Sequence, residues 1–235
     1  MRLTCSAKVG LSVVGKHMDI NNIITNEIPS LIAKDSIETA IQYMDDWKVG
    51  HLAVLNGKKF LGLLDESVLL SAEGVQNNVG EFELIDIKVS PKVHIFDVIE
   101  LMVDYKLSMV AVVDEEGNYL GEILPFHIIE CLADLTAVRQ EGSVIVFEMN
   151  DVDYSLGDIA RHVEANDAKV LSASVARLGD SRMVQVSLKI NETNIRGIVQ
   201  TLQRYNYTIK ATYDAPNYQD DLRNRYDELM RYLNT

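Results

Sequence analysis

The chain has 235 residues, which is long enough for two compact units with separate cores, and its hydrophobic fraction of 47% is ordinary for a globular protein. Its 22 basic and 35 acidic residues give a net charge of −13, which disfavours broad binding to nucleic acids and to anionic membrane surfaces. The two cysteines, Cys5 and Cys131, lie far apart and offer neither a disulfide framework nor the spacing of metal ligands. No run is long enough for a membrane-spanning helix, so we expect a cytoplasmic protein.

Residues 1–17 precede the patterned part of the chain, which opens at residue 18. They are weakly apolar, are interrupted by Lys8 and Lys16, and have no clear signal-peptide core or cleavage site. We expect them to be a tag, the product of a start site assigned too far upstream, or a disordered arm.

Residues 35–129 contain one pattern twice. A shift of 58 positions lays the helical pattern of residues 37–47 on residues 95–105, and the apolar run of residues 49–55 on residues 107–113. One additional residue in the second turn then brings Gly62 onto Gly121. Each copy reads as a β-α-β-β-α unit that is too small to bury its own sheet well, so we expect the two copies to pack together. The predicted repeats span residues 18–80 and 81–138.

Local signals support these elements. Asp35 is a candidate N-cap, and Glu38 three residues later would complete a capping box. Asn56-Gly57 predicts a tight hairpin turn, and Pro125 suits the first turn of a helix that continues through Leu135. Residues 73–83 are polar and glycine-containing, which is typical of a linker.

Two aromatic residues, Trp47 and Tyr105, occupy equivalent helix ends in the repeats. We expect them to pack between the repeats rather than to form a stacking platform for a ligand.

The second half of the chain has a different order of elements. Residues 142–215 alternate as β-α-β-β-α-β, which is the ferredoxin-like arrangement, with Ser155 capping the first helix and residues 191–193 capping the second. Residues 217–235 predict an amphipathic helix that docks on the body of the protein or on a second subunit.

Two segments carry a family resemblance. KVGHLAVLNGKKFLGLLDESVLL (residues 48–70) and KLSMVAVVDEEGNYLGEILPFHII (residues 106–129) resemble a tandem pair of CBS domains, the cystathionine-β-synthase module. Residues 142–215 resemble an ACT domain, and the order of the three units is similar to that of the acetoin-utilisation type of regulatory protein. The resemblance implies an α+β fold in which the two CBS copies clasp head to tail and leave two clefts, where many relatives bind adenine nucleotides.

The nucleotide motif of such clefts is Gly, two apolar residues, Thr or Ser, two variable residues and Asp. In this chain the last two key positions hold Asp65 and Val68 in the first copy, and Leu124 and His127 in the second. The carboxylate that should bind the ribose is therefore replaced in both copies, so an adenine nucleotide is in doubt and the cofactor is unknown. The resemblance places eight candidate ligand-binding residues in the clefts, namely Ile28, His51, Asp65, Val68, Ile87, Met109, Leu124 and His127.

Two of these candidates are histidines. His127 could meet an anionic ligand or make its cleft sensitive to pH, but we favour a hydrogen-bonded structural role for it, and a structural role for His51 as well.

A second candidate site is the ACT loop formed by Asp151, Asp153, Tyr154 and Ser155. Its first residues resemble a calcium loop, although helix capping by Ser155 explains them better because the required Gly and Glu of an EF-hand are missing. Tyr154 stands near a position where ACT domains often have Gly, which argues against the usual pose of an amino-acid ligand.

These observations favour a non-enzymatic regulatory protein that senses a small molecule in a CBS cleft or at the ACT interface. It would act in trans on an unidentified partner enzyme or transporter, and it would form a homodimer. The alternative is a scaffold or interaction protein whose clefts bind no ligand. A small enzyme is disfavoured because the sequence lacks a nucleophile–base pair and a metal-ligand constellation.

Overall fold

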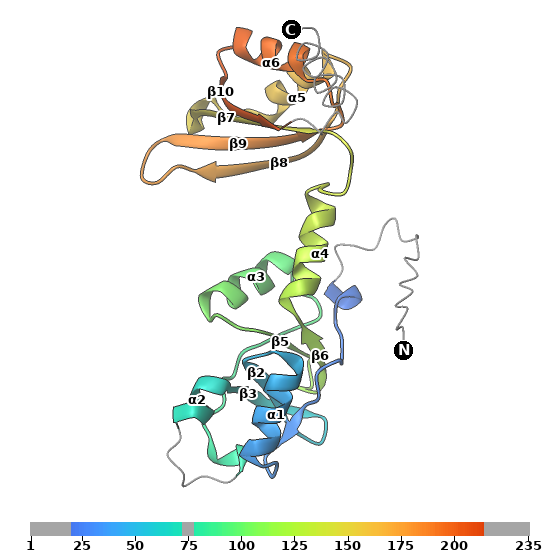
Figure 1. Ribbon diagram of the computed structural model, residues 1–235, viewed down its shortest axis with the longest axis vertical. Helices are drawn as coiled ribbons and strands as arrows, with labels where there is room; N and C mark the ends of the chain where they lie inside the picture. Colours follow the sequence, from blue (N-terminus) through green and yellow to red (C-terminus); the bar gives the residue numbers. More distant parts are fainter. Residues whose placement is uncertain (1–19, 72–77, 214–235) are drawn as a thin grey trace, which may run out of the picture. The chain divides into compact units, whose positions relative to one another are not determined.

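The computed structural model describes residues 20–71 and 78–213, which fall into two compact units divided between Leu132 and Ala133 (Figure 1). The predictions for residues 1–17 and 217–235 lie outside the described residues.

The first unit contains the two repeats, except for the last residues of the helix that ends the second one. Each has a three-stranded sheet in which the central strand pairs in parallel with the first strand and antiparallel with the third. The first repeat consists of β1 (Leu31–Ile32), α1 (Ile37–Trp47), β2 (His51–Asn56), β3 (Lys59–Asp65) and α2 (Glu66–Ser71), and a short 3₁₀ turn, η1 (Ile20–Asn22), precedes it. The second consists of η2 (Val79–Glu81), β4 (Lys88–Val89), α3 (Ile95–Asp104), β5 (Val110–Val113), β6 (Tyr119–Ile123) and α4 (Pro125–Leu135).

The start of α1 differs from the prediction. Ser36 is the N-cap, and its hydroxyl accepts from the Thr39 amide at 3.3 Å. Asp35 instead accepts from the Ile32 amide at 2.8 Å and stabilises the turn after β1, so the predicted Asp35 and Glu38 capping box is wrong. Two adjacent residues could each cap this helix, and the turn requires the first of them.

Each repeat is bound by the segment that precedes the first strand of the other. Thr25 and Glu122 exchange two backbone hydrogen bonds of 2.9 and 2.8 Å, which join the start of the first repeat to β6. Ile85 and Leu63 exchange equivalent bonds of 2.8 and 2.9 Å, which join the start of the second repeat to β3. This reciprocal exchange makes one structure from two repeats that are individually small.

The two β-hairpins also meet. Tyr119 donates its amide to the Lys58 carbonyl at 2.8 Å, and the rings of Phe60 and Tyr119 stack with their centroids 6.3 Å apart. Trp47 and Tyr105 do not take part, because 44% and 58% of their surfaces are exposed. The prediction that these two residues pack between the repeats is therefore wrong.

The second unit is a four-stranded antiparallel sheet with two helices on one face (Figure 1). The strands lie in the order β10-β7-β9-β8, which is the ferredoxin-like topology predicted from the sequence. Its elements are β7 (Ser143–Asn150), η3 (Asp151–Asp153), α5 (Leu156–Glu164), β8 (Val170–Arg177), β9 (Met183–Ile190), α6 (Arg196–Arg204) and β10 (Thr208–Tyr213). The predicted α+β fold, a repeat pair followed by a ferredoxin-like unit, is confirmed.

The core of this unit follows from the alternation of the strands. Ile145 and Phe147 of β7 and Leu188 of β9 are fully buried against Ile159 of α5 and Ile198 of α6.

One prediction in this unit is wrong. No side chain caps α6 at residue 195, and Asn191 accepts from the Lys169 amide at 2.6 Å instead.

Candidate functional site

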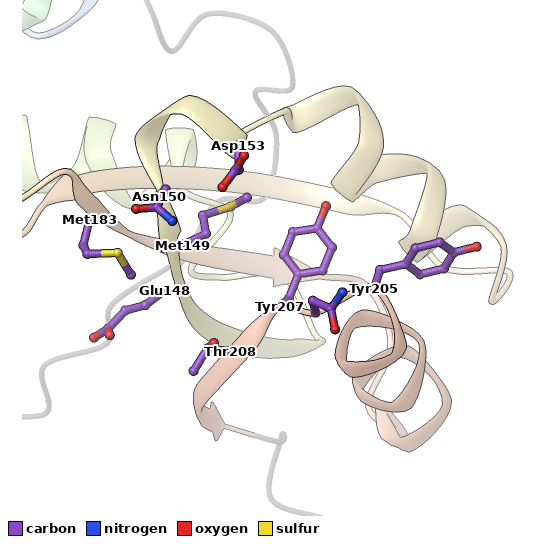
Figure 2. Close-up of a pocket in the computed structure, with 9 residues that line it drawn as sticks. Glu148, Met149, Asn150, Asp153, Met183, Tyr205, Tyr207 and Thr208 are labelled. Carbon is purple, nitrogen blue, oxygen red and sulfur yellow. The ribbon is translucent and has the colours of Figure 1, made fainter.

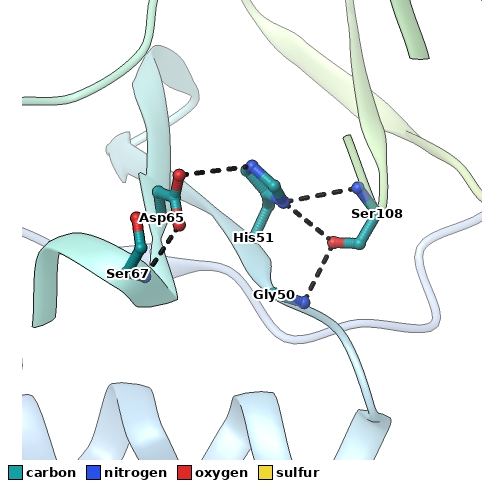
Figure 3. Close-up of polar contacts among 5 residues, drawn as sticks. All are labelled: Gly50, His51, Asp65, Ser67 and Ser108. Carbon is teal, nitrogen blue, oxygen red and sulfur yellow. Dashed lines mark hydrogen bonds and ion pairs between the residues drawn. The ribbon is translucent and has the colours of Figure 1, made fainter. Parts of the chain in front are cut away.

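His51 lies at the start of β2 and is only 7% exposed. Its Nδ1 atom lies 3.1 Å from the Ser108 hydroxyl and accepts from the Ser108 amide at 3.3 Å, as Figure 3 shows. Because the Gly50 amide donates to the same hydroxyl at 3.0 Å, the hydroxyl hydrogen is free to point toward Nδ1. The remaining proton of a neutral ring then sits on Nε2, which lies 3.8 Å from the Asp65 carboxylate.

These contacts place Asp, His and Ser side chains in one row, but the row does not have the geometry of a catalytic triad. The separation of 3.8 Å between His51 and Asp65 is too long for a hydrogen bond, and Asp65 already accepts from the Ser67 amide at 2.8 Å. Burial lowers the pKa of His51, and the charge of Asp65 opposes this shift only in part. The arrangement is a polar link between the repeats.

The other cleft candidates differ in burial. Val68 is half-buried on α2, Met109 is fully buried, and Ile87 is half-buried just before β4. The His127 amide donates to the Leu124 carbonyl at 3.1 Å.

The side chain of His127 differs from our expectation. Its Nδ1 atom is buried without a hydrogen-bond partner among the described residues, so the hydrogen-bonded role that we favoured is not realised at this atom.

The backbone amide of Ile28 is bound by Glu122, a residue that was not selected from the sequence. Glu122 of β6 is completely buried, and its carboxylate accepts from the amides of Glu27 and Ile28 at 2.8 and 3.0 Å. The Thr25 hydroxyl lies 3.3 Å from the same oxygen, and the Tyr119 hydroxyl donates to the other at 2.6 Å. Burial raises the pKa of Tyr119, and the hydrogen bond to the Glu122 carboxylate raises it further. One signal was available, since Glu122 stands where the first repeat has Leu63.

The ferredoxin-like unit contains a pocket of about 310 Å³ at the end of the sheet where β7 stops and β9 and β10 start (Figure 2). It includes Asp153 from the predicted loop, together with residues that the sequence analysis did not select. The pocket is lined by Glu148, Met149, Asn150, Asp153, Met183, Tyr205, Asn206, Tyr207 and Thr208.

The four residues of the predicted loop have separate roles. The Ser155 hydroxyl accepts from the Asp158 amide at 3.3 Å and caps α5, as predicted. Tyr154 packs against the core, and Asp151 lies 4.0 Å from Arg177. Asp153 alone lines the pocket.

The aromatic residues of the pocket are held by neighbouring rings. Tyr205 stacks on His162 with centroids 3.8 Å apart, and Tyr207 meets the edge of Phe147 at 5.3 Å. Burial raises the pKa of Tyr207, so its phenol stays neutral near neutral pH. The tyrosines flanking Asn206 directly after α6 were the available sequence signal.

Within the described residues, no group of His, Cys, Asp and Glu is arranged to hold a metal ion. No helix of the described part is long and apolar enough to cross a membrane.

Comparison with solved structures gives several matches to about half of this chain. A CBS domain pair/ACT domain protein from Thermotoga maritima is 20% identical, with 49% of this chain and 96% of that chain covered and a TM-score of 0.45. CBSX2 in complex with AMP is 15% identical, with 52% and 98% covered and a TM-score of 0.45. The cytosolic domain of the Mg²⁺ channel MgtE in complex with ATP is 19% identical, with 49% of each chain covered and a TM-score of 0.42.

The family assignment rests on a separate comparison. The CBS domain model matches residues 20–74 and again residues 80–134, and these ranges contain the two β-α-β-β-α repeats. The reciprocal exchange of their first segments joins them in one unit. Residues 20–134 therefore form a tandem pair of CBS domains.

Proposed function

We propose that this protein is a non-enzymatic regulator that binds a small molecule in the pocket of its ferredoxin-like unit and acts on a partner enzyme or transporter in trans. Proteins with CBS domains are typically regulatory ligand sensors, which supports the class. The observation that carries the proposal is the pocket of about 310 Å³, because that volume lies in the range of small-molecule sites. The order of the units also supports the resemblance to the acetoin-utilisation type of regulator.

The CBS clefts are our second candidate position for a ligand. Asp65 binds the start of α2 through the Ser67 amide, and Val68 has no group that could accept a ribose hydroxyl. His127 stands in the equivalent position of the second repeat. These substitutions favour the pocket over a nucleotide in the clefts.

We propose that the second repeat also mediates a homodimer. Phe96 and Val103 of α3, and Phe126 and Ile129 of α4, are between 59% and 68% exposed. The equivalent positions of the first repeat hold Glu38, Asp45, Ser67 and Leu70. Three of the four exposed apolar side chains of the second repeat thus have a charged or polar counterpart in the first, and such an exposed apolar patch is typical of a contact surface. Light scattering of the full chain should report a dimer, and Phe126→Glu should shift it toward the monomer.

The sensing function is tested by thermal unfolding of the full chain with adenine nucleotides, amino acids, divalent cations and small amines. A ligand that binds only the folded state must raise the unfolding temperature once its concentration exceeds Kd. We expect one of these classes to raise the unfolding temperature, and we expect Asp153→Asn to reduce that shift. Glu164→Gln, which removes one negative charge at an exposed position of α5, should leave the shift unchanged.

The same experiment identifies the alternative. If no class shifts the unfolding temperature at millimolar concentration, the sensor proposal fails and a scaffold with empty clefts takes its place. A nucleotide-dependent shift that Asp153→Asn leaves intact would move the ligand from the pocket to the CBS clefts.

A further inference from the structure

We infer that the pocket of the ferredoxin-like unit accepts a small organic cation, specifically an amine without a carboxylate group. This inference rests on the proposed function, because it specifies the ligand of the same pocket. It follows from the charges, the ring positions and the hydrogen-bonding groups of the lining residues.

The charges of the lining are all negative. Glu148 and Asp153 are the ionisable carboxylates, and no Lys, Arg or His lines the pocket. Glu148 is already paired with Lys210 at 2.7 Å, whereas the exposed Asp153 carboxylate has no ion pair among the described residues. Figure 2 shows the Asp153 side chain above that of Met149. A cation entering the pocket would therefore meet one uncompensated carboxylate, in a chain whose net charge of −13 also attracts cations.

The walls suit a cation with an apolar body. Tyr207 presents a ring that is fixed by Phe147, and the face of a tyrosine ring attracts ammonium groups. The thioethers of Met149 and Met183 supply polarisable apolar surface for methylene groups.

Polar groups in the same lining can accept from N–H donors. Asn150 and Asn206 have carboxamide oxygens, and Thr208 has a hydroxyl. An ammonium group needs several acceptors because it has three donors.

The same lining disfavours anions and zwitterions. A ligand carboxylate or phosphate would need a cationic partner, and the nearby Lys210 is engaged by Glu148. It would also lie near the Asp153 carboxylate, and like charges in close proximity repel. An α-amino acid therefore gains less in this pocket than an amine that lacks the carboxylate.

Isothermal titration of the full chain tests this inference with putrescine as the probe and γ-aminobutyrate as its analogue, in which a carboxylate replaces one amine-bearing carbon. We expect putrescine to bind with a Kd at least tenfold lower than that of γ-aminobutyrate. Asp153→Asn should raise the Kd for putrescine at least tenfold, which corresponds to about 1.4 kcal/mol. Glu164→Gln removes one negative charge from the same unit outside the pocket, and it should leave the Kd unchanged.

A second variant separates a charge effect from damage to the fold. Lys210→Ala releases Glu148 from its ion pair and adds a second free carboxylate to the pocket, so it should lower the Kd for putrescine. If Lys210→Ala damaged the fold instead, the Kd for putrescine could only rise.

The inference is overturned if putrescine does not bind, if γ-aminobutyrate binds as tightly, or if Asp153→Asn binds putrescine like the natural chain. If putrescine fails while another class of ligand raises the unfolding temperature in a manner that depends on Asp153, only the inference falls and the proposed function stands. If no class of ligand has an effect, both fall.

Discussion

Replacing Glu122 with Leu tests the reciprocal exchange that unites the repeats. Leu is the residue at the equivalent position of the first repeat, Leu63, which is also fully buried, so a side chain of this size fits the architecture. In the second repeat the substitution removes the acceptor of the Glu27 and Ile28 amides and of the Tyr119 hydroxyl. The segment before β1 would keep its two backbone bonds between Thr25 and residue 122 and the bond from the Asn26 side-chain amide to the Leu120 carbonyl.

The magnitude follows from these bonds. Removing one partner of a buried, hydrogen-bonded charge costs about 3–5 kcal/mol, and leaving a single buried donor unpaired costs about 1–3 kcal/mol. The Glu27 amide is near the surface and water can replace its acceptor, whereas the Ile28 amide and the Tyr119 hydroxyl are more deeply placed. Loss of the cost of burying the carboxylate offsets part of the effect. We therefore expect Glu122→Leu to lower the free energy of unfolding by about 3 kcal/mol, and Tyr119→Phe by about 1.5 kcal/mol.

Urea denaturation followed by the fluorescence of Trp47, the only tryptophan, reports on the CBS pair selectively. The control is Glu100→Leu, which makes the same chemical change at an exposed position of α3 and should stay within about 0.5 kcal/mol of the natural chain. A loss below about 1 kcal/mol for Glu122→Leu would refute the reasoning, because it would mean that residues 25–28 are held without the carboxylate.

Three further substitutions test single features. Gly121→Ala should lower the free energy of unfolding by more than about 3 kcal/mol, because a Cβ atom there would lie 2.2 Å from the Thr25 carbonyl oxygen, whereas Gly117→Ala, also at positive φ but with open space around it, should cost only about 1 kcal/mol. Because the pKa of His51 is lowered in the folded state, the unfolded chain binds a proton at a higher pH than the folded chain does. The free energy of unfolding is therefore fully present above about pH 6.5 and falls as the pH drops toward the folded-state pKa. His51→Gln should reduce the dependence of the unfolding free energy on pH by up to about 1.4 kcal/mol per pH unit, measured by urea titrations. Ser155→Ala should cost about 1 kcal/mol by loss of the α5 cap, measured by circular dichroism of thermal unfolding, and an unchanged transition would contradict the assigned cap.

The fold was predictable because its signals are periodic. The helical face of residues 37–44 recurs after 58 positions, and the alternation of β9 is regular over eight residues. In both cases the periodic apolar positions are enough to predict the helix or the strand. Caps depend instead on single hydrogen bonds. The choice between Asp35 and Ser36 as the N-cap was decided by the turn after β1, which no local pattern encodes.

The pocket was harder to predict because its lining comes from four places in the chain. Residues 148–150 end β7, Asp153 lies in η3, Met183 starts β9, and residues 205–208 connect α6 to β10. Only the antiparallel register, which sets Asn150 opposite Met183 and Thr208 opposite Glu148, brings them together. Asp153 could be predicted because it follows a strand and precedes a capped helix, whereas among its neighbours in the pocket only the tyrosines that flank Asn206 carry a sequence signal.

The glycines of the CBS motif are kept in both repeats because the packing of the two repeats requires them. A Cβ atom on Gly62 would lie 2.6 Å from the Leu84 Cβ atom, and the corresponding distance at Gly121 is 2.2 Å to the Thr25 carbonyl oxygen, so both glycines are required where the first segment of the other repeat crosses. Of the positions that would hold a nucleotide, Asp65 accepts from the Ser67 amide at the start of α2 instead. The motif therefore separates into a part that maintains the CBS pair and a part that binds a ligand. This chain keeps the glycines and has Val68 and His127 at the expected carboxylate positions, which is why we propose the pocket beside Asp153 as the ligand site.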